Sequence, residues 1–142
     1  MFNAKIWHEG EALAQEYLKK LGYKIIETNA KMAGSEVDIV AKEPKKLVIK
    51  RIKADFDAGK LEKSAYISAK KNQTDILVFA EVKARTRQDF GTPEQAVNNH
   101  KKQAIKRFAT AYIKKHNINN MQIRFDVISV VASNIEHFED AF

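Results

Sequence analysis

The sequence contains no cysteine. Without thiols, the chain can form neither disulfide bonds nor thiolate metal sites. The longest apolar runs, ILVFA and VISVVA, are far too short to cross a bilayer. The first residues, MFNAKIWHEGEA, also lack the apolar stretch and the small-residue cleavage site of a signal peptide. We therefore expect a cytoplasmic protein with no membrane segment.

Two further absences narrow the chemistry. The segments GSE and FGTPEQ do not have the glycine spacing of a P-loop or of a dinucleotide-binding loop. The four histidines are not arranged as in H-E-x-x-H or a similar metal motif, so we expect each of them on the surface. These patterns argue against a phosphate-cradling glycine loop and against a histidine-based zinc site.

What the chain does have is an excess of positive charge. Its 142 residues include 25 Lys and Arg against 18 Asp and Glu, which gives a net charge of +7. The hydrophobic share of 44% is typical of a soluble globular protein, and the length suits one domain, residues 1–142. The basic excess favours a polyanionic partner, with nucleic acid preferred to a membrane surface. The alternative is a basic surface that is simply solvated.

Hydrophobic periodicity predicts two helices and four strands. In the first helix, Trp7, Ala14, Leu18 and Leu21 recur at helical spacing. The second is expected to begin with a capping box made by Thr92, Pro93 and Gln95. The predicted helices span 3–21 and 93–116, the predicted strands span 23–30, 36–43, 75–85 and 122–132, and the tail 133–142 is expected to be a short helix or an irregular cap.

The order of these elements predicts an α/β fold. Three strands in succession favour an antiparallel meander, and the long second helix can cross over to add the last strand in parallel. The result would be a mixed sheet between helices. Segment 43–74 is weakly patterned and is interpreted as an insertion, either a hairpin extension turning near Ala58 and Gly59 or a short helix through 55–65.

Charged residues occupy positions where this pattern expects core. In the strand DILVFAEVKAR, one face starts with Leu77 and Phe79 and then carries Glu81, Lys83 and Arg85. Burying such charges is costly unless a partner compensates them. Each is ordinary when taken alone, because a Glu-x-Lys pair on a strand is usually solvated or salt-bridged.

Two more carboxylates share this unusual placement. Glu11 lies on the apolar face of the first helix, and Asp38 is embedded in an apolar strand. Packing of the helix over a hairpin would bring both acids close to Glu81 and Lys83. Three carboxylates suit Mg²⁺ or Mn²⁺, and a lysine beside them can orient or deprotonate a water. The cluster predicts metal-dependent hydrolysis of a phosphodiester bond.

Basic residues near this cluster are candidate phosphate contacts. Arg85 and Arg87 follow the third strand, and Lys101 and Lys102 lie on the basic face of the second helix. Farther along, Arg124 and Asp126 share a strand face and are expected to pair with each other.

Five segments together resemble the YraN family of small bacterial proteins. They are GEALAQEYLKKLGYKIIETNAK, SEVDIVAKE, LVFAEVKAR, FGTPEQAVNNHKKQAI and RFDVISV, and they cover nearly the whole chain outside 43–74. The resemblance implies the restriction-endonuclease-like fold, an α/β/α sandwich of the PD-(D/E)xK nuclease superfamily that is similar to archaeal Holliday junction resolvases. Ser35 stands where the family usually has glycine, and Ala80 where it usually has valine.

The resemblance also implies roles for particular residues. Glu11 matches the helix-borne acid, Asp38 the acid of the second strand, and Glu81 with Lys83 the E-x-K pair. Glu36 is a further candidate in the same segment, and Gln95 and Lys101 match helix-borne phosphate or water contacts. The implied cofactor is Mg²⁺ or Mn²⁺, the implied substrate is DNA, branched or single-stranded, and the implied assembly is a homodimer.

Two alternatives remain open. The chain can be a nucleic-acid-binding module that has kept the fold and its charges without turnover. It can also be a basic adaptor that docks an acidic protein partner through residues 45–71.

Overall fold

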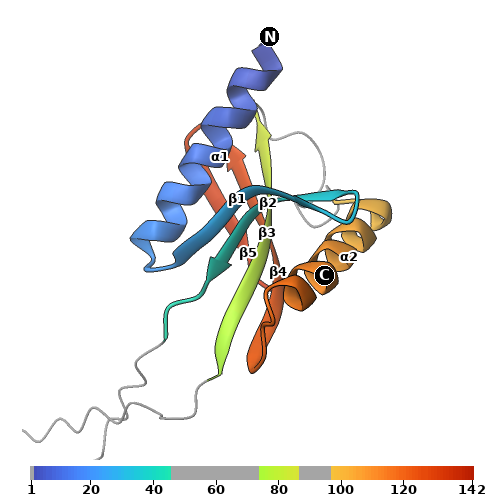
Figure 1. Cartoon of the computed structure of the whole chain (residues 1–142). Helices are drawn as coiled ribbons and strands as arrows, with labels where there is room; N and C mark the ends of the chain where they lie inside the picture. Colours follow the sequence, from blue (N-terminus) through green and yellow to red (C-terminus); the bar gives the residue numbers. More distant parts are fainter. Residues whose placement is uncertain (1, 46–73, 87–96) are drawn as a thin grey trace, which may run out of the picture.

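The computed structural model describes residues 2–45, 74–86 and 97–142. This part of the chain contains two helices and five strands, and Figure 1 shows how they are arranged. In chain order they are α1 (Phe2–Lys20), β1 (Lys24–Met32), β2 (Ser35–Lys42), β3 (Asp75–Arg85), α2 (Asn99–Lys115), β4 (Met121–Val131) and β5 (Asn134–Phe138). Neither helix is long and apolar enough to cross a membrane within these ranges.

The five strands form one mixed sheet in the order β1-β2-β3-β4-β5. Strands β1, β2 and β3 pair antiparallel as a meander, and β4 pairs parallel to β3. This confirms the predicted topology, in which α2 carries the chain across the sheet between β3 and β4. The two helices cover opposite faces of the sheet (Figure 1).

Alternation along β3 divides the core in two. On one face, Val78, Ala80 and Val82 pack with Ala14 and Leu18 of α1. On the other face, a second apolar cluster joins the sheet to α2 and contains Leu77, Phe79, Ile105, Phe108 and Tyr112. The architecture is an α/β/α sandwich, consistent with the restriction-endonuclease-like fold expected from the sequence.

The predicted apolar face of α1 is only partly buried. Ala14 and Leu18 are fully buried, whereas Trp7 is 41% and Leu21 49% exposed. Gly10 lies against the sheet, where a Cβ atom would collide with the side chain of Ala84. The tight contact of the helix with the sheet is therefore centred on its middle turns.

Two predicted elements differ from the structure, the start of the second helix and the carboxyl-terminal tail. Helix α2 begins at Asn99, because Asn98 is extended and its side chain accepts a hydrogen bond from the Lys101 amide at 2.8 Å, as an N-cap residue does. The predicted start at Pro93 and its capping box lie outside the described residues. The tail is not a helix or an irregular cap, since Asn134–Phe138 forms β5 along the open edge of β4 and Ile135 packs against the α1-side core. The predicted insertion at 43–74 lies almost wholly within residues 46–73, which are also outside the described residues.

Candidate active site

The site lies where β2 and β3 separate. Their ladder runs from the Lys42–Leu77 pair to the Ile39–Ala80 pair and ends there. At the next position of β2, Asp38 Oδ2 accepts a hydrogen bond from the Val82 backbone amide at 2.7 Å. The aspartate side chain thus takes the place of a strand partner, which directs its carboxylate toward β3.

Glu81 lies on β3 beside this separation and its side chain is only 5% exposed. Its Oε1 is 3.3 Å from Lys83 Nζ, and its Oε2 is 3.3 Å from Lys101 Nζ of α2. Oε2 has no well-oriented hydrogen bond within the described residues. A buried carboxylate needs compensating charge, and here the two ammonium groups supply it.

The Asp38 carboxyl is electrostatically perturbed. Burial, followed by the nearby charge of Glu81 and to a lesser degree that of Glu11, raises its pKa to about 7. The Val82 amide and Lys101 act in the opposite direction. Asp38, Glu81 and Glu11 are therefore close enough for their charges to affect one another, which is a common property of functional sites.

Glu11 reaches this region from α1. Its Oε2 accepts a hydrogen bond from Asn29 Nδ2 of β1 at 3.2 Å. Asn29 has a positive φ of 48°, which asparagine tolerates better than most residues. The four residues predicted to form the site, on α1, β2 and β3, are thus gathered at one end of the sheet.

The donor chemistry fits a hard divalent cation. Asp38 and Glu81 present carboxylate oxygens, and the underbonded Glu81 Oε2 would gain a partner from a bound ion. Within residues 2–45, 74–86 and 97–142, however, no group of three His, Asp or Glu side chains is arranged to hold a metal. Mg²⁺ keeps several waters and is commonly held by one or two carboxylates plus substrate phosphate, and Asp38 and Glu81 would supply two such carboxylates.

Two contacts around the lysines are not predictable from strand alternation. Lys83 Nζ lies 5.7 Å from the ring centroid of Trp7 on α1. Lys101 Nζ is also 3.3 Å from the Glu36 carbonyl oxygen, to which it donates a hydrogen bond. Lys101 is predicted as a phosphate or water contact, but in the structure it connects α2 to the carboxylate cluster.

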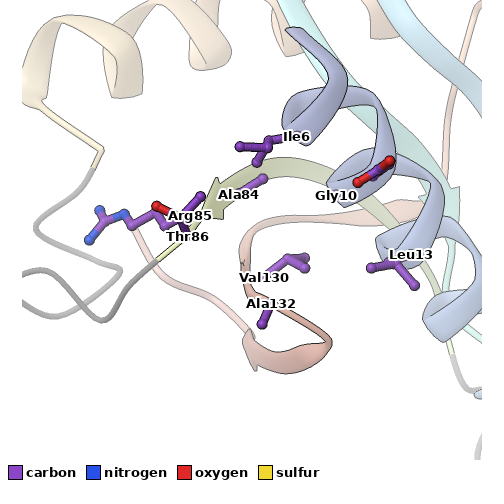
Figure 2. Close-up of a pocket in the computed structure, with 9 residues that line it drawn as sticks. Ile6, Gly10, Leu13, Ala84, Arg85, Thr86, Val130 and Ala132 are labelled. Carbon is purple, nitrogen blue, oxygen red and sulfur yellow. The ribbon is translucent and has the colours of Figure 1, made fainter. Parts of the chain in front are cut away.

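The other predicted residues are more scattered. The Glu36 carboxylate pairs with Lys31 at 3.9 Å, and Lys102 Nζ lies over the Phe142 ring at 5.8 Å. Arg85 is half-buried and lines a cavity of about 220 Å³ between α1 and the ends of β3 and β4, and Figure 2 shows its guanidinium pointing away from Leu13. Arg87 and Gln95 lie outside the described residues.

A second polar cluster surrounds Asp126 on β4. Arg124 and Asp126 pair as predicted, through Nε and an Nη atom at 2.8 Å each. His137 Nε2 lies 2.7 Å from Asp126 Oδ2, and the His137 side chain is only 4% exposed. The prediction that every histidine is on the surface is therefore wrong for His137, because the predicted fold lacked β5, which brings this ring to Asp126.

The fold and the cluster define an α/β protein with a carboxylate–lysine site at the end of a split sheet. The model of the uncharacterised protein family UPF0102, also called the YraN family, matches residues 10–130, and the chain belongs to this family. It is 37% identical to the UPF0102 protein of Caldanaerobacter subterraneus subsp. tengcongensis over 85% of this chain and 75% of the relative. It is 34% identical to the UPF0102 protein of Thermodesulfovibrio yellowstonii over 100% of this chain and 99% of the relative. Neither name states an activity.

Proposed function

We propose that this chain is a divalent-metal-dependent nuclease that hydrolyses phosphodiester bonds in DNA. The observation that carries the proposal is the forced proximity of Asp38 and Glu81 where β2 and β3 separate, with the pKa of Asp38 raised to about 7. Holding the half-buried Asp38 carboxylate beside the buried Glu81 carboxylate is unfavourable for folding, and a bound cation would offset the cost. The net charge of +7 supports a polyanionic substrate.

Each residue has a role that follows from its contacts. Asp38 and Glu81 would anchor Mg²⁺ or Mn²⁺, and Glu11 adds negative charge that favours a cation. When bound, such an ion polarises a phosphoryl oxygen and lowers the pKa of a coordinated water. Lys83, held in place by Glu81, is positioned to orient the attacking water and to stabilise charge on the phosphate.

The reaction is balanced by water alone. The water oxygen forms a bond to phosphorus while the bond between phosphorus and the leaving oxygen breaks. One proton of the water passes to the solvent, and the solvent supplies one proton to the leaving oxygen. Lys83, 3.3 Å from the Glu81 carboxylate, would donate a hydrogen bond to the attacking water.

The test is cleavage of labelled duplex, single-stranded, flap and four-way-junction DNA in EDTA, Mg²⁺ and Mn²⁺. Wild type should cut at least one substrate only with a divalent ion. Asp38→Asn and Lys83→Ala should each lose about 100-fold or more in rate, as when groups that stabilise a transition state are removed. Circular dichroism would show that each variant is folded.

Lys20→Ala is the matched control, because it removes one positive charge from the exposed end of α1. It should cut at nearly the wild-type rate. Cleavage that survives Asp38→Asn, or that proceeds in EDTA, would contradict the proposed site.

A second function is favoured by one observation. Both oxygens of Glu81 already lie beside lysine ammonium groups, so much of its charge is balanced without a metal. A nucleic-acid-binding module on this fold would keep that arrangement. It would bind the same DNAs with equal affinity in EDTA and Mg²⁺, retain binding after Glu81→Ala and cut none of them.

A further inference from the structure

Trp7 is the only tryptophan of the chain and it is 41% exposed beside the proposed site. Large aromatic side chains usually bury most of their surface, so an exposed one at a functional site needs an explanation. It lies one helical turn before Glu11, on the same side of α1. Its ring faces Lys83 Nζ at 5.7 Å, which is within the range of a cation–π contact.

The packing of α1 on the sheet sets where the Trp7 backbone lies relative to β3. Gly10 allows the helix to approach Ala84 more closely than any other residue would permit. Lys83 precedes Ala84 on β3 and is itself held by Glu81. The indole therefore lies at the rim of the site, next to Lys83 and partly exposed to solvent.

We propose that Trp7 is a stacking platform for an unpaired nucleobase next to the scissile phosphate. A phosphate held at Lys83 would place the adjoining base of the same nucleotide within reach of the ring. Aromatic side chains stack on any base, but a paired base already stacks on its neighbours and must leave the helix first. The inference rests on the DNA-binding part of the proposed function and narrows its substrate to single-stranded DNA or to unpaired nucleotides in branched DNA.

The single tryptophan makes stacking directly measurable. Wild type would be titrated in EDTA, where the proposed cleavage cannot occur, with a single-stranded oligonucleotide and with the matching duplex. Saturable quenching of the Trp7 emission is expected with the single strand and little change with the duplex. Saturable single-strand binding, measured by anisotropy, without any change in emission would overturn the inference.

Substitutions test whether the ring sets the preference. Trp7→Leu should weaken single-strand binding about tenfold and change duplex binding less than twofold, since it keeps apolar bulk and removes the stacking face. Trp7→Phe should restore part of the loss. Leu21→Ala, at an exposed apolar residue beyond the far end of α1, is the control and should bind as wild type does. Equal losses on both DNAs after Trp7→Leu would overturn the inference.

The two proposals fail in different ways. If quenching and the effect of Trp7→Leu are seen but no DNA is cut with either metal, the nuclease proposal is wrong and the stacking proposal is supported. If cutting requires Asp38 but proceeds equally on duplex and single strand, and Trp7→Leu leaves the cutting rate unchanged, the nuclease proposal is supported and the stacking proposal is wrong.

Discussion

At the scale of single residues, Asp38 is placed where its surroundings oppose its ionised form. Burial is the largest cause, and the charges of Glu81 and Glu11 add to it. The Val82 amide hydrogen bond compensates only in part. A position that served stability alone would be better filled by a neutral side chain, and this unfavourable placement is what the proposed metal site would account for.

This argument predicts how Asp38→Asn changes stability with pH. Because the pKa of Asp38 is raised from 3.8 to about 7, the folded state binds a proton that the unfolded state releases between these values. Wild type should therefore lose stability as pH rises through this interval, and the loss should level off above it. The asparagine variant lacks this titration and should be more stable than wild type by roughly 1–3 kcal/mol at pH 8, and by little at pH 4.

Urea unfolding of wild type and Asp38→Asn at several pH values measures the difference between their free energies of unfolding. The titration of the other acids is common to both proteins and cancels in this difference. Glu136→Gln, an exposed acid on β5, is the matched control and should show no such pH-dependent gain. A gain of equal size at pH 4 and pH 8 would contradict the role given to the Asp38 charge.

Sequence alone identifies site residues that break the alternation of a strand, but not contacts that depend on how two elements pack. Asp38 and Glu81 stand out because strand alternation makes a charge at a core position visible. The contact of Lys101 with Glu81 depends on how α2 crosses the sheet, and nothing in a basic helical face reveals that. The spacing of Trp7 predicts a core position, but its side chain is 41% exposed because the first turns of α1 extend beyond the end of β3 (Figure 1).

At the scale of elements, β5 decides the surroundings of β4. Asp126 on β4 is fully buried and receives Arg124 from its own strand, His137 from β5 and the Asp140 backbone amide at 3.1 Å. Arg124 also donates to the Tyr23 hydroxyl at 2.9 Å. The cluster therefore fastens the carboxyl-terminal strand to the start of β1.

Sequence patterning predicts the Arg124–Asp126 pair but not β5, because a five-residue polar strand has too little hydrophobic alternation to be recognised.

We predict that Asp126→Asn destabilises the fold by about 2 kcal/mol or more, because the buried Arg124 then loses its bidentate partner and keeps only Glu43, at 3.2 Å, and the more exposed Glu139, at 3.7 Å, as countercharges. Burial alone would raise the pKa of Asp126, but hydrogen bonds from His137, Arg124 and the Asp140 amide hold it below its usual 3.8. The stabilisation by the ionised form is thus present above pH 3.8 and is lost as pH falls through the lower, folded-state pKa.

Urea unfolding at pH 7 tests the size of this effect, and an acid titration of wild type tests its direction. Glu136→Gln on β5 again serves as the control, since it alters a charge that is exposed. A variant as stable as wild type at pH 7 would show that the cluster does not fasten β5.

At the scale of the whole molecule, the order of the sheet brings distant segments to one site. The meander places β2 beside β3, the parallel crossover places α2 against the other side of β3, and α1 covers the first face. Glu11, Asp38, Glu81 and Lys101 come together only because of this topology. The order of strands and helices along the sequence is enough to predict the meander and the crossover, since consecutive strands usually pair and a helix between two strands allows a parallel crossover.

The net charge of +7 predicts that DNA binding depends steeply on salt, because each neutralised phosphate releases counterions. Between 50 and 200 mM salt, single-strand affinity should fall at least about tenfold in EDTA. If Lys102 contacts phosphate, Lys102→Gln should weaken binding and lower the slope of log K against log salt by about 1, whereas Lys20→Gln should leave the slope unchanged. Equal slopes in all three proteins would remove Lys102 from the DNA-binding surface and leave that role to other basic residues.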